Sequence, residues 1–480
     1  MMRRPQSELP VAMFSSIQLW TTVVALILAP LFFGSVDLFW IAVWAILLSI
    51  SVLCGVAAPM DTGQSRVLFG FFALCGIYTL VAIVQSTPHV IDQLNDPSWR
   101  RANDLLGLDA LPRISSRAEM PLLAVGHFLL FATAFISGFL IGTSPRNSDR
   151  LIRFAQYSIL IFAIYGVAAL ILTPNMVLWA PKVAYRGSLT ATFINHNTAA
   201  TFIGAGAILW FCSAFSSLQQ SFGFSSIRFL LLDRANEHLA FKILARSGGA
   251  LTCFFALLLT GSRGGLICSC LGLLVAIVLM VANRQKPRFW HMALWGTVAL
   301  AVTIALLSRM GRIGSQGLFD DARWSVYGFC VEAIRQRPLL GAGLGTFEDL
   351  FPSLRADNFY SWGVWDYAHS TILEIAVEMG IAVAAMVVIA ALASLFILAR
   401  AAVKSEGRSR RSLAAITGIA VLSYLHSMID FSLQIPGYLV LFGVLLGCGL
   451  ARASAKSAKA AVRPLALLEL LSDQKPALGR

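Results

Sequence analysis

The feature that most limits how this chain can fold is a series of apolar runs without charged residues, each roughly 17 to 25 residues long. Runs of this length match the thickness of a bilayer core, whereas a soluble protein divides its apolar residues among short strands and amphipathic stripes. The composition agrees, since 58% of the residues are hydrophobic and 13% are charged. These observations exclude a disordered chain and argue against a soluble enzyme.

The sequence predicts an all-α polytopic membrane protein with about 12 transmembrane helices. We expect a single multi-span membrane domain over residues 1–453, with a large periplasmic loop over 308–379 between spans 9 and 10 that contains amphipathic helices. Residues 454–480 are expected to form a basic cytoplasmic tail. The predicted spans lie at 17–36, 38–57, 66–85, 120–142, 152–174, 197–216, 247–261, 264–282, 291–307, 380–399, 412–429 and 436–452.

The net charge of +13, from 37 Lys and Arg against 24 Asp and Glu, first suggests a nucleic-acid partner. Most of the basic residues, however, precede the first span or lie in every second connector, such as 146–153 and 400–411. The positive-inside rule makes these connectors cytoplasmic, so that both termini are cytoplasmic and the first span is a retained anchor. No nucleic acid is therefore expected as a partner, whereas membrane lipids are.

Two arginines stand out at the predicted outer boundary of the membrane. Arg186 opens the string RGSLTATFINHNTAA, which also contains Asn197, and Arg263 lies in TGSRGG, a very short turn between two spans. An arginine in such a place binds an anion, faces a water-filled cavity or snorkels to lipid headgroups. The glycines on both sides of Arg263 would let a phosphate approach backbone amides and guanidinium together, which favours anion binding there. For Arg186 the alternatives stay open.

His369 opens a helical stretch, AHSTILEIAVEMGI, in which Glu374 and Glu378 are expected to form a polar stripe. It follows an aromatic run over 359–367 that could stack on sugar rings. A lone histidine is usually structural, but a neutral imidazole at an outer surface also suits a general base that takes a proton from a hydroxyl.

Other candidates are weaker. Arg323 is expected to form a solvated or lipid-facing row with Arg335 and Arg337 on an amphipathic helix. His426 and Asp430 are four residues apart, which would place them on one helical face, either as an oriented imidazole or as a structural hydrogen bond. The acidic pairs at 320–321 and 348–349 are expected to be solvated, so we expect no metal site, and the eight cysteines imply no disulfide framework.

Four segments together resemble the O-antigen ligase and polymerase superfamily of bacterial envelope glycosyltransferases. They are RGSLTATFINHN, TGSRGG, RW followed by RPLLGAGLGTF, and AHSTILEIAVEMG, and the closing HSMIDFSLQIPGYLVLFGVLLG is similar to the last two spans of that family. The resemblance covers roughly residues 185–450. The family usually has Asn-Pro-Asn where this chain has Asn195-His196-Asn197.

The resemblance implies a glycan donor linked through diphosphate to a polyprenyl lipid, a lipid-linked or glycan acceptor, and transfer on the periplasmic side of the bacterial inner membrane. It also implies a metal-independent reaction that inverts the anomeric carbon and uses no cofactor. Arg186 and Arg263 would hold the diphosphate and His369 would deprotonate the acceptor hydroxyl. Supporting positions fall to Asn197, Arg323, His426 and Asp430.

We expect an O-antigen ligase-like enzyme, and three alternatives remain. A polymerase would use the same donor and hold a second diphosphate lipid, for which Arg309, Arg312 and Arg323 are available. Another branch of the family transfers glycans to protein hydroxyls. A 12-span transporter or flippase, from a different class, would instead place charged residues deep within the spans.

Overall fold

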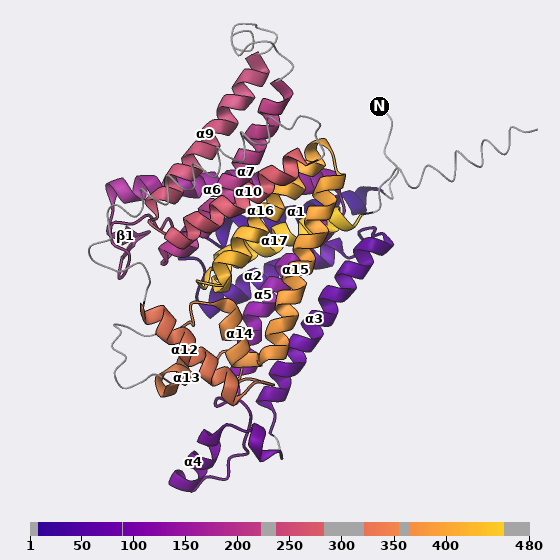
Figure 1. Ribbon diagram of the computed structural model, residues 1–480. Coiled ribbons are helices and arrows are strands. Elements are labelled where there is room, and N and C mark those ends of the chain that lie inside the picture. Colours follow the sequence, from indigo (N-terminus) through magenta and orange to yellow (C-terminus); the bar gives the residue numbers. More distant parts are fainter. Residues whose placement is uncertain (1–7, 89, 222–236, 283–320, 355–364, 456–480) are drawn as a thin grey trace, which may run out of the picture.

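The computed structural model describes residues 8–88, 90–221, 237–282, 321–354 and 365–455, and these residues are mostly helical (Figure 1). Among them, nine helices are long and apolar enough to cross a membrane. The predicted class of a multi-span helical membrane protein is therefore confirmed. The total of about 12 stays a prediction, because the predicted span 291–307 lies outside the described residues.

The helices divide between the predicted spans and the connectors. Those that correspond to spans are α1 (Glu8–Leu28), α2 (Leu38–Gly55), α3 (Thr62–Ser86), α5 (Met120–Gly142), α6 (Pro145–Leu172), α7 (His196–Ser221), α9 (Glu237–Leu259), α10 (Arg263–Val281), α15 (Ile381–Lys404), α16 (Gly407–Ser427) and α17 (Pro436–Ser454). Those in connectors are η1 (Asp92–Leu94), α4 (Pro97–Leu106), the antiparallel strands β1 (Met176–Val177) and β2 (Ala180–Pro181), α12 (Asp321–Gln336), α13 (Phe347–Leu354), α14 (Thr371–Met379) and η3 (Ser432–Gln434).

Several helices begin or end away from the edges of the apolar runs. α1 ends at Leu28 although the first run continues to 36, because Pro30 lacks a backbone N–H and disfavours helical geometry in the residue before it. α6 and α9 begin before their apolar runs, at Pro145 and Glu237, so that the basic connectors continue the helices. Apolar pattern thus locates these spans but not their polar ends.

The centre of the bundle is the close contact between α5 and α17. Each helix carries a GxxxG pair, Gly138 with Gly142 and Gly443 with Gly447. A Cβ atom on Gly138 would overlap the carbonyl group of Val444, and one on Gly447 would overlap the backbone of α5. Small residues at this spacing let two membrane helices approach at backbone distance, where van der Waals contacts hold them together.

The connectors that were predicted to be periplasmic lie on one side of the molecule. Figure 1 shows α4, α12, α13 and α14 in the lower part of the view and β1 at the left, away from the upper ends of α7 and α9 that flank residues 222–236. Two of these connectors are joined, since Gln85 donates hydrogen bonds to the carbonyl oxygens of Leu340 and Glu378, at 2.6 and 2.8 Å.

The expected row of arginines on α12 is wrong for Arg337. Its guanidinium forms an ion pair with Asp96, at 2.8 Å, and both side chains are largely buried. Arg335 forms only an exposed pair with Glu332, at 3.8 Å. Arg337 therefore ties the 86–119 connector to the loop that follows α12, a contact between distant segments that local spacing does not encode.

Candidate active site

The turn around Arg263 is short and tightly built. Gly261 has a φ of +70°, and Ser262 caps α10 by accepting a hydrogen bond from the backbone N–H of Gly265, at 3.1 Å. Arg263 is therefore the first residue of α10, where the helix dipole adds positive potential. Its side chain is half-buried, and no hydrogen bond or ion pair joins its guanidinium to another residue in the described part of the chain.

Asn197 connects this turn with the segment after α16. Its amide nitrogen donates to Asp430 at 2.7 Å, and its amide oxygen accepts from the hydroxyl of Ser262 at 2.7 Å. All three residues are buried. The Arg263 turn is thus fixed to α7 and to the 428–432 segment by side-chain hydrogen bonds in buried surroundings, where such bonds are costly to break.

The expectation that His426 and Asp430 share a helical face is wrong. α16 ends at Ser427, so Asp430 lies beyond the helix and points to Asn197 and to Ser432, whose hydroxyl donates to it at 2.9 Å. His426 is 1% exposed, and its Nδ1 lies 2.7 Å from the hydroxyl of Thr201. The alternative of a structural hydrogen bond is the one that the geometry favours, although with different partners.

His369 lies in a strained turn immediately before α14. Its φ is +56°, a left-handed conformation that is uncommon for histidine. Nδ1 lies 3.0 Å from the carbonyl oxygen of Tyr367, and the backbone oxygen of His369 accepts a hydrogen bond from the Tyr327 hydroxyl at 3.0 Å. Because a carbonyl oxygen only accepts, Nδ1 carries the hydrogen, and the lone pair of a neutral ring is on Nε2.

Aromatic contacts bring His369 to the same segment as Asn197. The imidazole contacts Trp365, at 4.7 Å between ring centroids, and Phe431, at 4.9 Å. Tyr367 stacks on the same Phe431 ring at 4.6 Å. Phe431 directly follows Asp430, so the 428–432 segment is the common support for the histidine and for the Asn197 network.

Arg323 also reaches this segment. Its guanidinium donates to the carbonyl oxygen of Ile429 at 3.0 Å, from the first turn of α12. The structure therefore brings Asn197, Arg323, His369, His426 and Asp430 to the 428–432 segment. Arg263 is linked to it less directly, because the neighbouring Ser262 bonds to Asn197.

Arg186 lies on a neighbouring loop and is exposed. Its Nε donates to the carbonyl oxygen of Lys182 at 3.2 Å, and the buried Lys182 ammonium donates to the carbonyl oxygen of Ser188 at 2.8 Å. The loop meets the Arg263 turn through Tyr185, which stacks on His196 at 4.1 Å, while His196 Nδ1 lies 2.8 Å from the carbonyl oxygen of Thr260. The His196 of the Asn-His-Asn string thus joins the two loops.

The expected polar stripe of Glu374 and Glu378 lies on α14, where both side chains are buried. Glu374 accepts hydrogen bonds from the backbone N–H of Ala368 at 2.7 Å and from Gln434 at 2.6 Å. Glu378 accepts from the backbone N–H of Phe347 at 3.0 Å. Burial, and then the charge of Glu378, raise the pKa of Glu374, and burial raises the pKa of Glu378 to about 7.

These two carboxyl groups are structural anchors that the sequence did not reveal. Glu374 fastens the backbone next to His369, and Glu378 fastens the glycine-rich loop, in which Gly341, Gly343 and Gly345 have positive φ values. The i, i+4 spacing correctly predicts that the two share a face of α14. What that face meets depends on chain segments distant in sequence.

The family of this region follows from a comparison with family models. Residues 248–388 match the model described as O-antigen ligase. This region of the chain is similar to the O-antigen ligase family. The predicted resemblance to that superfamily is thereby confirmed for this region, and nine helices among the described residues are long and apolar enough for a multi-pass membrane protein. No curated protein matches the chain.

The ligase match covers part of the candidate site. It contains Arg263, Arg323 and His369, whereas Arg186, Asn197, His426 and Asp430 lie outside it. The hydrogen bonds of Asn197 and the ring contacts of Phe431 join the outlying segments to the matched region. The candidate site is therefore larger than the matched domain.

Proposed function

We propose that this protein transfers a glycan from a polyprenyl-diphosphate carrier to a sugar hydroxyl of an acceptor, on the periplasmic side of the bacterial inner membrane. The observation that carries the proposal is the geometry of His369. Its Nδ1 faces the Tyr367 carbonyl oxygen, so that the lone pair of the neutral ring is on Nε2, and the ring packs against two aromatic side chains. A base fixed in this way can deprotonate a hydroxyl without first reorienting.

The reaction would be an in-line displacement without a metal. The acceptor oxygen forms a bond to the anomeric carbon while the bond from that carbon to the diphosphate oxygen breaks, which inverts the configuration. The hydroxyl proton moves to Nε2 of His369, and the polyprenyl diphosphate leaves with the bonding electrons. Arg263 and Arg186 would stabilise that negative charge, because guanidinium groups bind phosphate oxygens bidentately.

The charge state of the site supports a diphosphate ligand. Arg263 is half-buried at a helix N-terminus, and its guanidinium has no carboxylate partner among the described residues. The guanidinium and the helix N-terminus both carry positive potential there, so that together they attract an anion. Arg323, by contrast, is already bonded to Ile429, which suits a role in holding α12 over the 428–432 segment.

The test is a transfer assay with purified protein, labelled lipid-linked oligosaccharide and candidate acceptors, without nucleotide and with a metal chelator. We expect His369→Gln to lower the rate by roughly 100-fold or more, the size of a general-base contribution, and to leave donor binding unchanged. His238→Gln, at the exposed start of α9, is the matched control. Undiminished transfer by His369→Gln would refute the assignment.

Donor binding by a lysine variant tests whether Arg263 acts through its positive charge alone or also through the planar shape of its guanidinium. Arg263→Lys keeps the positive charge but removes the bidentate fork, so we expect roughly tenfold weaker binding of polyprenyl diphosphate. Unchanged binding would indicate that Arg263 only snorkels to the headgroups. Product size distinguishes the two related enzymes, since a ligase adds one glycan and a polymerase gives a ladder.

A further inference from the structure

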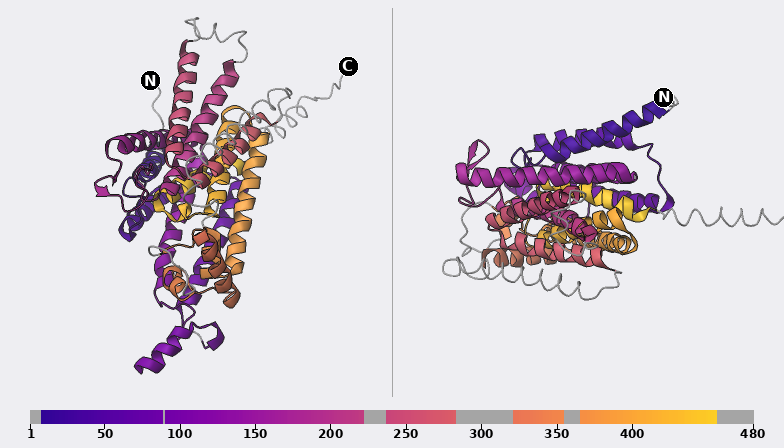
Figure 2. Two further views of the ribbon diagram at one scale, coloured as in Figure 1. Left: turned by 60° about the vertical axis from the view of Figure 1, so that its left-hand side comes forward. Right: turned by 90° about the horizontal axis from the view of Figure 1, so that it is seen from above.

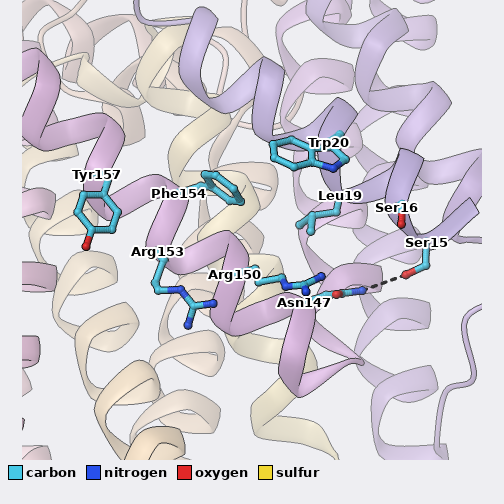
Figure 3. Close-up of a pocket in the computed structure, with 9 residues that line it drawn as sticks. All are labelled: Ser15, Ser16, Leu19, Trp20, Asn147, Arg150, Arg153, Phe154 and Tyr157. Carbon is cyan, nitrogen blue, oxygen red and sulfur yellow. Dashed lines mark hydrogen bonds between the residues drawn. The ribbon is translucent and has the colours of Figure 1, made fainter. Parts of the chain in front are cut away.

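A groove of about 460 Å³ lies between α1 and α6, on the side of the bundle where both helices begin. It is far from the candidate active site, because α6 is 28 residues long, or roughly 40 Å, and the Arg186 loop follows its other end. Figure 2 shows α1 and α6 side by side, and Figure 3 shows the side chains that line the groove. Nothing in the proposed transfer reaction uses it.

The lining of the groove changes from polar to apolar along both helices at matching levels. Near the start, Asn147 of α6 donates a hydrogen bond to the hydroxyl of Ser15 of α1, at 2.9 Å. Two turns further on, Phe154 of α6 meets Trp20 of α1, with ring centroids 5.2 Å apart. In Figure 3, Asn147 accordingly lies in the lower part of the view with the arginines, and the two rings lie in the upper part. A ligand that fits has a polar head and an apolar tail.

The polar end of the groove carries positive charge that no carboxylate among the described residues neutralises. Arg150 is half-buried and Arg153 is exposed, and neither forms a hydrogen bond or ion pair with another described residue. The nearby carboxylate, Asp149, is paired with Arg452 at 2.6 Å, whose side chain is 8% exposed. The arginines therefore leave a local charge that an anion would balance, and their planar forks match phosphate oxygens.

The apolar end faces the surroundings of the protein. Trp20 is 54% exposed and Tyr157 is 55% exposed. Aromatic side chains with one polar end are characteristic of the region where lipid headgroups meet acyl chains. In a phospholipid the phosphate lies directly above the acyl chains. Exposed rings beside two arginines that have no ion-pair partner among the described residues match that arrangement.

We propose that the groove between α1 and α6 is a binding site for an anionic phospholipid. Arg150 and Arg153 bind the phosphate oxygens, the polar groups of Ser15 and Asn147 lie beside the headgroup, and an acyl chain lies along Trp20. The bound lipid fills the space between two helices and so stabilises their contact. This site is independent of the transfer reaction.

The experiment measures lipid binding to the full-length protein in detergent. Dimyristoyl phosphatidylglycerol is titrated, and bound lipid is followed by native mass spectrometry and by the shift of the thermal unfolding midpoint, which rises with the logarithm of ligand concentration above Kd. Arg150→Gln and Arg153→Gln should each weaken binding roughly tenfold. Arg146→Gln removes the same charge from the same helix outside the groove, and should change the affinity by about twofold or less.

Further arms distinguish the sources of the phosphate. Dimyristoyl phosphatidylcholine, which has no net charge, should bind more weakly than phosphatidylglycerol, and glycerol phosphate, which has no acyl chain, should not displace the lipid. Arg150→Lys keeps the charge and should retain part of the affinity, which separates lost binding from misfolding. An equal loss in Arg146→Gln, or displacement by glycerol phosphate at the lipid's own concentration, would overturn the proposal.

Discussion

Replacing Asn197 by alanine should weaken both the fold and the binding of donor. The substitution removes the hydrogen bond to Asp430, at 2.7 Å, and the one from Ser262, at 2.7 Å. It also leaves a buried carboxylate oxygen without its amide donor, and a buried unpaired group is costly. Because Ser262 is the N-cap of α10, the change reaches Arg263 through the backbone.

The magnitude follows from these two contacts. A hydrogen bond to a charged group contributes about 1.5 to 3 kcal/mol, and a neutral one about 1 kcal/mol. Asn197→Ala should therefore lower the free energy of unfolding by roughly 3 kcal/mol. We expect donor affinity to fall roughly tenfold, equivalent to about 1.4 kcal/mol, because a loosened cap no longer holds the Arg263 backbone in one place.

The assay pairs thermal unfolding in detergent with titration of labelled polyprenyl diphosphate. Gln64→Ala is the matched control, since Gln64 is also buried and also makes two hydrogen bonds, to the backbone of Ala451 and from that of Asp61, each at 3.0 Å. It should be destabilised to a similar or smaller degree and bind donor normally. If Asn197→Ala binds donor as the wild type does, or if Gln64→Ala loses binding equally, the coupling through Ser262 is refuted.

Three further outcomes are expected. Gly380→Ala should lower the free energy of unfolding by roughly 3 kcal/mol, because φ is +85° and a Cβ would overlap the backbone, while Gly76→Ala, with open space around it, should be neutral in the same thermal assay. The pKa of Glu378 is raised by burial from 4.5 to about 7, so its contribution to stability is present below about pH 4.5 and is lost as the pH rises through about 7. In Glu378→Gln, the thermal unfolding midpoint should therefore change less with pH over this range. A pH dependence equal to that of the wild type would contradict the effect of burial. Arg337→Ala should speed proteolytic cleavage within residues 92–117, whereas Arg335→Ala, whose ion pair is exposed, should not.

The sequence predicted the spans well because apolar length is a local property. Runs at 120–142 and 436–452 coincide with α5 and α17 to within two residues. The prediction is wrong or incomplete where another segment decides the outcome, as at Pro30, which ends α1 inside an apolar run, and in α14, whose charged face is buried against distant backbone.

The candidate site shows the same division. Arg263 and His369 could be identified from local motifs in the sequence. The residues that support them, Ser262, Phe431 and Gln434, could not, because their contacts appear only in the fold. Serine, phenylalanine and glutamine are common in such segments, and their partners lie on other elements. Only the fold shows which of them are used.

The turn that carries His369 is fastened from its protein side, through Glu374 and the Tyr327 hydroxyl. Its outward side, where Asp366 is exposed, takes no part in that fastening among the described contacts. Under the proposed transfer reaction, outward side chains such as Asp366 are therefore the ones to exchange in libraries that aim to change the acceptor while the imidazole keeps its position.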